Sequence, residues 1–214
     1  MPAQRASHPV FARYYARVSL AMDKGGMAAH RRQLLAGLAG PVIEVGAGNG
    51  LNFAHYPADV TRVLAIEPDP HLREIASRNA AQAPVPVGVC GGVAAGLPAD
   101  DGTFDGAVTA FVLCSVPDQH AALREIHRVL RPGGVLHFLE HVRASTPVLR
   151  RVQRLADVTI WPALAGGCRT SRDTAAAIQA AGFTIGQLEP FRFPDPGLTM
   201  PATPHVRGIA TRNP

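Results

Sequence analysis

An acidic residue followed by glycines at alternate positions is the strongest chemical signal in this sequence. Val42-Ile43-Glu44-Val45 has the composition of a short buried strand, and Gly46-Ala47-Gly48-Asn49-Gly50 follows it directly. Glycine can adopt φ > 0 and lets a ligand approach the backbone, so this stretch predicts a tight turn that holds a nucleotide-like cofactor. The dinucleotide fingerprint G-x-G-x-x-G is incomplete, because Leu51 stands at its sixth position. A plain glycine turn between a strand and a helix is the alternative interpretation.

A second acidic residue, Glu67, lies 23 residues after Glu44 and closes the next apolar run, Thr61–Ile66. A carboxylate at the end of a second parallel strand can accept two hydrogen bonds from ribose hydroxyls. An isolated glutamate would more simply be a solvated residue at a strand end. The sequence separation between Glu67 and the glycine turn favours the interpretation that Glu67 binds a ribose.

Two histidines stand beside predicted strands. His141 follows a strand expected at 135–140, and His205 opens the last strand, expected at 206–211. Ligands bind at the carboxyl ends of strands in open α/β sheets, and an imidazole there can take up a proton or favour an anion. For both residues, a structural histidine bonded to backbone carbonyls is the competing interpretation.

The elements that must position these residues alternate between strands and helices. Strands are expected at 42–45, 62–66, 85–89, 104–112 and 135–140, and helices at 51–55, 70–80 and 118–130. The residues Arg131-Pro132-Gly133-Gly134 predict a stop and turn before the last of these strands. Regular β–α alternation predicts an α/β domain whose parallel sheet is covered by helices on both faces.

The two ends of the chain depart from this alternation. Residues 10–20 and 27–38 have apolar residues at helical spacing and predict a two-helix lid that breaks at Gly25-Gly26. Near the other end, helices are expected at 146–160 and 171–181, with breaks at Trp161-Pro162 and Gly166-Gly167, followed by strands at 183–188 and 206–211. We therefore expect one domain over 1–214: a helical lid at 1–40, a cofactor-binding core at 41–142, and an acceptor-side insert with an edge hairpin at 143–214.

Composition narrows the class of protein. The three cysteines are widely spaced, and neither C-x-x-C nor H-E-x-x-H occurs, so we expect no disulfide framework and no metal site. The net charge of +5 comes from scattered arginines rather than a basic stripe with aromatic platforms, which argues against a nucleic-acid partner. No apolar run approaches the roughly 20 residues that span a bilayer, and residues 1–8 lack the apolar core of a secretion signal. A cytoplasmic monomer or homodimer is expected.

Several motifs resemble class I S-adenosylmethionine-dependent methyltransferases. The E-x-G-x-G-x-G spacing from Glu44 to Gly50 is similar to their first motif. The stretch 97–105 is similar to their L-P-x-x-D-G-x-F-D sequence, and 130–134 to their L-R-P-G-G turn. The resemblance implies a Rossmann-like fold with a seven-stranded, mostly parallel sheet in the order 3-2-1-4-5-7-6. It also implies S-adenosyl-L-methionine as the cofactor.

The resemblance assigns roles in cofactor binding. The glycine loop, with Gly46, Ala47, Gly48 and Gly50, would pass under the methionine part of the cofactor, and Glu44 would help to anchor its amino group. Glu67 and Pro68 would lie at the ribose, and Cys114 would contact the cofactor through its backbone. Many relatives carry an acid near Val93 and Ala94 that holds the adenine amino group. Its absence here implies adenine held by backbone groups and apolar packing, or an alignment shifted by a few residues.

Four motifs in the second half resemble the alkyl-thiol methyltransferases: Val112–Val116, Phe138–Val142, Gly167–Arg172 and Pro204–Gly208. This resemblance implies methyl transfer to a small-molecule acceptor, favouring a thiol or sulfide. His141 would be the first candidate to favour the thiolate, and His205 would line the same pocket. Arg169 and Arg172 are expected to cap local carbonyls, with a clamp on an anionic acceptor as the alternative. Cys168 is expected to be a small buried hydrophobe. The alternatives are O- or C-methylation of a phenol or quinone, and a non-catalytic cofactor-binding protein.

Overall fold

A single mixed sheet forms the centre of the molecule, in a computed structural model that describes residues 9–195 and 197–214. Its strands follow the order β3-β2-β1-β4-β5-β7-β6. The first five strands pair in parallel, and β7 pairs antiparallel with both β5 and β6. The strands are β1 (Gly40–Val45), β2 (Val60–Ile66), β3 (Val87–Cys90), β4 (Phe104–Ala110), β5 (Leu130–His141), β6 (Phe183–Arg192) and β7 (Pro204–Arg212). The predicted Rossmann-like α/β fold and its strand order are confirmed.

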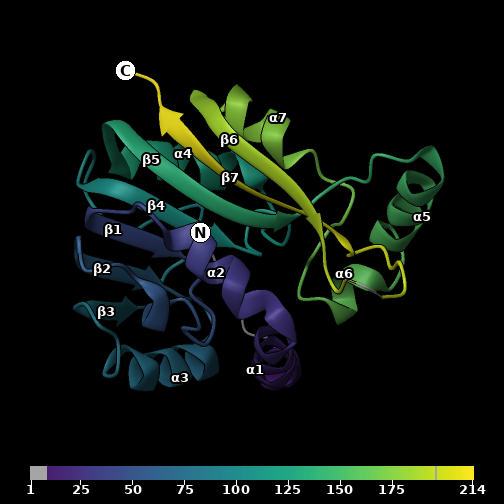
Figure 1. The fold of residues 1–214 in the computed structure, drawn as a ribbon, viewed down its shortest axis with the longest axis horizontal. Coiled ribbons are helices and arrows are strands. Elements are labelled where there is room, and N and C mark those ends of the chain that lie inside the picture. The colour runs from purple at the N-terminus through teal and green to yellow at the C-terminus, as the bar shows by residue number, and fades with distance from the viewer. Residues whose placement is uncertain (1–8, 196) are drawn as a thin grey trace.

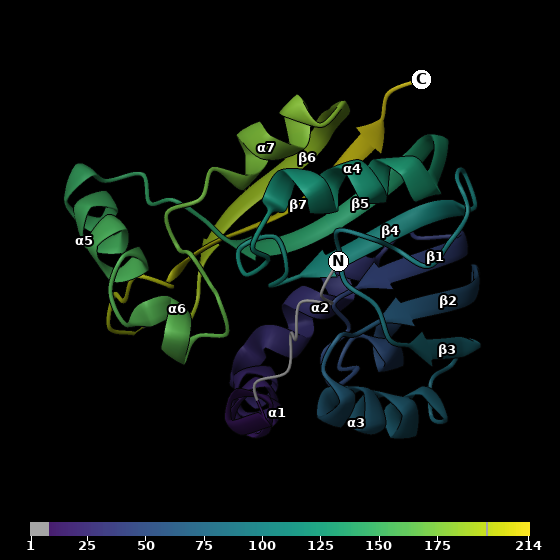
Figure 2. The same ribbon diagram turned by 180° about the vertical axis from the view of Figure 1, so that it is seen from behind.

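Helices cover both faces of this sheet (Figures 1 and 2). α4 (Gln119–Val129) and α7 (Thr174–Ala180) pack on one face, and α2 (Ala28–Leu35) and α3 (Pro70–Ala80) on the other. Three more helices lie beyond the carboxyl ends of the parallel strands: α1 (Pro9–Met22), α5 (Pro147–Asp157) and α6 (Trp161–Leu164). The carboxyl ends of the strands are therefore the side on which a ligand can be enclosed.

The alternation of side chains along the strands divides the core into two layers. In β1, Ile43 and Val45 join the layer under α4, whereas Val42 packs in the layer under α2. Successive side chains of a strand point to opposite faces, and a strand buried on both faces is apolar along its whole length. Glu44 is the exception in β1, since it is charged by type and only 2% exposed. A buried carboxyl group needs partners, and those partners belong to the site.

The N-terminal helices form as predicted. α1 and α2 are joined by a π-helical turn over Asp23–Met27, in which Gly26 has φ 116°. Only glycine adopts this conformation without strain, so the predicted break at Gly25-Gly26 is confirmed. α1 packs through Ala12 and Ala16 against Leu72 of α3. This contact places α1 beside the glycine loop.

Three local predictions are wrong. The helix expected at 51–55 is a single 3₁₀ turn, Phe53–His55, because the side chains of Asn52 and Tyr56 turn inward to Glu44. The helix expected at 146–160 does break, but it ends earlier, at Asp157, and Trp161-Pro162 instead starts α6, where a proline in the first turn needs no N–H partner. The turn expected at 131–134, before a strand at 135–140, is not separate from that strand. These residues belong to β5 and form an irregularity in its pairing with β4, between the pairs Phe104–Leu130 and Gly106–Val135.

Within residues 9–195 and 197–214, no helix combines the length and the apolar character that a membrane crossing demands.

Candidate active site

The glycine loop after β1 has the geometry of a cofactor cradle. Gly46 and Gly48 have φ of 71° and 57°, in the left-handed region. A Cβ at Gly46 would lie 2.5 Å from a methyl group of Val112, so no side chain fits there. The backbone N–H of Gly48 donates to the Glu67 carboxylate at 2.8 Å. The loop thus presents bare backbone at the carboxyl ends of β1 and β4, which is what close approach of a ligand requires.

Glu67 stands at the end of β2 as predicted. One carboxylate oxygen accepts the N–H of Gly48 and the other accepts the N–H of Asp69, at 2.8 and 2.9 Å. The residue is 5% exposed, and burial raises its pKa. Each carboxylate oxygen has two lone pairs, so both retain capacity for a further donor such as a ribose hydroxyl. Pro68 follows, and its carbonyl accepts from Arg73, which fixes the turn into α3.

Glu44 is the centre of a buried network. Its carboxylate oxygens accept from Asn52 Nδ2 at 2.8 Å and from the Tyr56 hydroxyl at 2.6 Å. Arg31 of α2 donates to the Asn52 amide oxygen at 3.0 Å and pairs with Asp23. Burial raises the pKa of Glu44 to about 7, against the lowering effect of the Tyr56 and Asn52 hydrogen bonds. Glu44 therefore ties the glycine loop to the N-terminal helices.

Tyr15 and Arg31 were not identified from the sequence. The Tyr15 ring lies 3.2 Å from the position of a Cβ on Gly48, so α1 closes over the glycine loop. Burial raises the pKa of the Tyr15 hydroxyl, and the charge of Arg31 opposes that rise. The only sequence signal was an aromatic residue on a helix predicted as a lid. Nothing in the pattern indicated which face of that helix meets the loop.

In the loop after β3, neither Val93 nor Ala94 provides a carboxylate that could hold the adenine amino group. Val93 is 42% exposed and forms an isolated bridge with Gly96, while Ala94 packs against the core. Asp101, one of the nearest acids, is exposed and pairs with Arg128. The predicted adenine contacts at Val93 and Ala94 stay a prediction.

The structure brings His141 and His205 together. They are direct partners in the antiparallel pair of β5 and β7, and their ring centroids lie 4.6 Å apart. His205 is 2% exposed and stacks on Phe191. Its Nδ1–H donates to the carbonyl of Thr203 at 2.8 Å, which leaves Nε2 as a buried acceptor without a protein partner. Burial first, and then the neighbouring His141, lowers the pKa of His205 to about 3, so the ring is neutral near pH 7.

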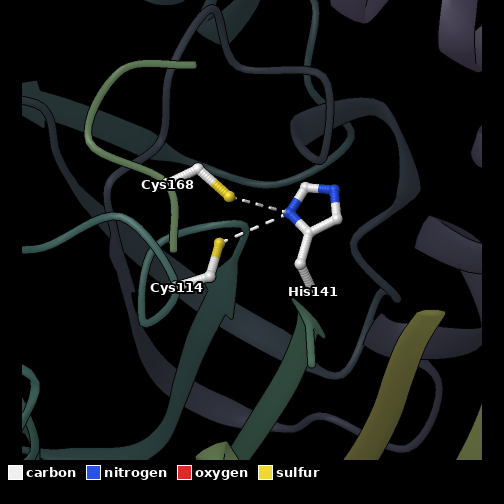
Figure 3. A group of neighbouring side chains, drawn as sticks. All are labelled: Cys114, His141 and Cys168. Atoms are coloured by element: carbon white, nitrogen blue, oxygen red, sulfur yellow. Dashed lines mark hydrogen bonds between the residues drawn. The ribbon is translucent and has the colours of Figure 1, made fainter. Parts of the chain in front are cut away.

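Two thiols face the other side of His141. Cys114 Sγ lies 3.4 Å and Cys168 Sγ 3.5 Å from His141 Nδ1. Figure 3 shows the two thiols and this face of the imidazole turned toward one another. Burial raises the pKa of Cys114, so that thiol keeps its proton. The hydrogen bond from Cys114, and then that from His141, lowers the pKa of Cys168 to about 5. The prediction that Cys168 is only a small buried hydrophobe misses this polar environment.

Backbone groups of the Cys114 segment are fully engaged. The Cys114 N–H donates to Glu140 and its carbonyl accepts from Arg169. Arg172 donates to the carbonyls of Leu113 and Val116, which confirms it as a cap of local carbonyls. Cofactor contact through the Cys114 backbone stays a prediction, and the thiol is the group that Cys114 leaves available.

A groove of about 620 Å³ leads to His205. Its walls come from α5, from the segment after β5 and from the β6–β7 hairpin, with Val148, Val152 and Phe191 among its apolar residues. The lining also includes Arg143, which pairs with Asp173, and Arg192. A groove with both apolar and polar walls suits a small organic molecule.

Fold and site together define a class I methyltransferase, and comparisons with known proteins agree. A family model described as "Methyltransferase domain" matches residues 43–138. Thiol S-methyltransferase TMT1A of Homo sapiens is 34% identical over 198 residues, 87% of this chain and 80% of the relative. The chain belongs to the family of these S-adenosylmethionine-dependent methyltransferases.

Two further similarities bear on the fold and the chemistry. A demethylmenaquinone methyltransferase of Staphylococcus saprophyticus is 34% identical, over 46% of this chain and 42% of the relative. The solved structure of an S-adenosylmethionine-dependent methyltransferase of Thermotoga maritima, titled a possible histamine N-methyltransferase, has a TM-score of 0.68. It is 21% identical and covers 95% of this chain and 99% of that chain. The protein is an enzyme that takes its methyl group from S-adenosylmethionine and transfers it to a small molecule.

Proposed function

We propose that this enzyme methylates the sulfur of a small thiol. The observation that carries the proposal is the extent of its similarity to the thiol S-methyltransferase. The general methyltransferase model ends at residue 138, whereas the similarity to the thiol enzyme spans 87% of the chain. A match of that length has to include acceptor-side residues on β5, β6 or β7. The demethylmenaquinone relative covers less than half of the chain, which gives carbon methylation weaker support.

On the donor side, the residues of this chain fit the cofactor. S-adenosylmethionine, when bound, supplies a methyl group on a positively charged sulfur. The bare backbone of Gly46 and Gly48 would lie under it, and the Glu67 carboxylate would accept the ribose hydroxyls. Each Glu44 oxygen accepts one hydrogen bond, from Asn52 or from Tyr56, and keeps a second lone pair. We propose that Glu44 positions the loop and the N-terminal helices and also helps to anchor the amino group of the cofactor. Tyr15 would exclude water from this crevice, which strengthens the electrostatic interactions inside it.

On the acceptor side, we propose different roles for the two histidines. A thiol with a pKa near 8.5 is only a few per cent ionised at pH 7, so the enzyme gains rate by favouring the thiolate. His205, with its pKa lowered to about 3, is too weak a base for this, but its buried Nε2 can accept a hydrogen bond from the S–H group of the incoming thiol and orient it before ionisation. His141 lies half-buried between His205 and the two thiols, and we assign it the task of favouring the thiolate.

Product analysis tests the acceptor class. The enzyme is incubated with S-adenosylmethionine and a panel of alkyl thiols, phenols and quinols, and methylated products are identified by mass spectrometry. We expect S-methyl products from the thiols and little product from the others. Methylation of a phenol oxygen or a quinol carbon, without any S-methyl product, would overturn the thiol assignment. Binding of the cofactor without turnover on any acceptor would point to a non-catalytic protein.

The cytoplasmic location and the monomeric or homodimeric state stay predictions. So do the absence of a nucleic-acid partner and the division into a lid at 1–40, a cofactor core at 41–142 and an acceptor side at 143–214.

A further inference from the structure

Three donor atoms, two thiol sulfurs and one imidazole nitrogen, converge from three separate segments beside the candidate acceptor site. Cys114 lies in the loop after β4, His141 is the last residue of β5, and Cys168 follows α6. Their ligand atoms all lie within 4.8 Å of one another. Figure 3 shows both sulfurs directed at the same ring nitrogen, Nδ1 of His141. No fourth Cys, His, Asp or Glu donor joins this group in the described part of the chain.

The spacing fits a tetrahedral metal ion. Zinc binds thiolate sulfur at about 2.3 Å and imidazole nitrogen at about 2.0 Å, so tetrahedral angles separate a sulfur from a nitrogen ligand by about 3.5 Å. The two sulfur–nitrogen distances here are 3.4 and 3.5 Å. Two cysteines and one histidine, with the fourth position open, is a ligand set of catalytic zinc sites, whereas structural sites are closed by four protein ligands.

The three donors are held in place by contacts that do not involve the donor atoms. The Glu140 carboxylate accepts the N–H groups of Val112, Leu113 and Cys114, at 3.0 to 3.1 Å. The Arg169 N–H donates to the Cys114 carbonyl, which ties the Cys168 segment to the Cys114 segment. A Cβ at Gly167 would lie 2.7 Å from the Ser115 carbonyl oxygen, so glycine is required for the two segments to approach this closely.

We propose that Cys114, His141 and Cys168 bind one zinc ion whose open fourth position takes the sulfur of the acceptor thiol. His141 would coordinate through Nδ1, and its Nε2 would carry the proton. Cys114 and Cys168 are buried and His141 is half-buried, so the site is protected yet reachable from the side of His141. The ligands would come from positions 114, 141 and 168, too far apart for any short metal-binding motif to indicate them. The acceptor part of this proposal rests on the proposed thiol methylation.

The step balances without a further reactant. On coordination the acceptor loses its S–H proton to solvent, because a metal ion favours the thiolate. A lone pair of that sulfur forms the new carbon–sulfur bond with the methyl group. The old carbon–sulfur bond of the donor breaks, and its electron pair neutralises the positive donor sulfur. The S-methyl product is a neutral thioether and a weaker zinc ligand than a thiolate, so it can leave.

Metal binding tests the site itself. The reduced, chelator-treated protein is titrated with Zn²⁺ by calorimetry, and with Co²⁺ while visible absorption is recorded, since tetrahedral cobalt–thiolate sites absorb strongly. We expect one ion per chain and a cobalt spectrum with thiolate character. Cys168→Ser and His141→Ala should weaken binding at least about 100-fold, more than the loss of an outer-shell partner typically does. Cys90→Ser is the matched control, because Cys90 is a free cysteine on β3 outside the group.

The outcomes separate this proposal from the proposed function. Absence of metal binding, or binding that Cys90→Ser weakens as much as Cys168→Ser, overturns the zinc site. A Cys114–Cys168 disulfide that persists under mild reduction also overturns it. If the metal-free enzyme methylates thiols at the full rate, zinc has no role in the reaction, and the proposal of thiol methylation is unaffected. A protein that binds zinc through these residues but methylates only carbon or oxygen keeps the site and refutes the thiol acceptor. Thermal melting of each variant confirms that it is folded.

Discussion

His141 and His205 lie directly opposite each other in the β5–β7 pair, with ring centroids 4.6 Å apart. The antiparallel register of β7 sets this pairing. A shift of one residue would turn every side chain of β7 to the other face and remove His205 from the site. The two residues are 64 positions apart in the chain, yet the pairing of β5 with β7 brings their rings together. One side of His141 faces His205, and its Nδ1 faces the two thiols.

Replacement of the two histidines should have unequal effects. We expect His141→Ala to lower kcat/KM for a thiol by roughly 100-fold or more, the scale of a group that activates a nucleophile. We expect His205→Asn to lower it only about 10-fold, because its pKa near 3 leaves it only hydrogen bonding to contribute. Steady-state kinetics with a thiol acceptor measures both. Affinity for S-adenosylhomocysteine serves as the control and should be unchanged in each variant. Equal losses would refute the separate roles.

Removal of the Glu67 charge should weaken cofactor binding. A hydrogen bond to a charged group contributes about 1.5–3 kcal/mol, so Glu67→Gln should weaken binding of S-adenosylhomocysteine by roughly 10-fold to 100-fold. Calorimetric titration measures the change. Glu74→Gln is the matched control, since Glu74 is an exposed glutamate on α3 that pairs with Arg78. Equal affinities of Glu67→Gln and wild type would remove Glu67 from the cofactor site.

Glu44 should make stability depend on pH in an unusual direction. Its folded-state pKa of about 7 is above the reference value of 4.5, so the folded state holds this proton more tightly than the unfolded state. The resulting stabilisation is fully present below pH 4.5 and is lost as pH rises through 7. Glu44→Gln removes this dependence. The free energy of unfolding of the variant, relative to wild type, should therefore rise by about 2–3 kcal/mol between pH 4.5 and 8.

Urea unfolding at several pH values measures this difference, and Glu74→Gln should show no comparable trend. The comparison with wild type cancels the titration of other buried groups, Glu67 and Glu140 among them. A flat difference between the variant and wild type would contradict the raised pKa.

Glu140 should be a major source of stability for the loop after β4. Glu140→Ala leaves the buried N–H groups of Val112, Leu113 and Cys114 without their acceptor. Each such loss costs about 1–3 kcal/mol, so the free energy of unfolding should fall by roughly 3 kcal/mol or more. Chemical denaturation measures it, with Glu74→Ala as the exposed control. A loss below about 1 kcal/mol would show that water or another group replaces the carboxylate.

Much of the fold could be predicted because the signals are local. The apolar run Val42–Val45 predicts a buried strand, and Gly25-Gly26 predicts the break between the first two helices. The strand order came from the resemblance to class I methyltransferases. The prediction of a helix at 51–55 is wrong because long-range contacts determine the conformation of this segment. Asn52 and Tyr56 satisfy the buried Glu44, and a regular helix there would have left that carboxyl group without them.

The residues predicted to bind the cofactor could be located from local sequence, because the glycine loop and Glu67 follow their strands directly and their spacing places them at one edge of the sheet. His141 and His205 could also be predicted, since each stands at the end of an expected strand. The two thiols beside His141 could not. Cys114, His141 and Cys168 meet because β4 and β5 end side by side and because Gly167 lets the segment after α6 approach Ser115. Donor atoms that chain folding brings together over such separations leave no pattern in the sequence, since each stands in its own segment among unrelated neighbours.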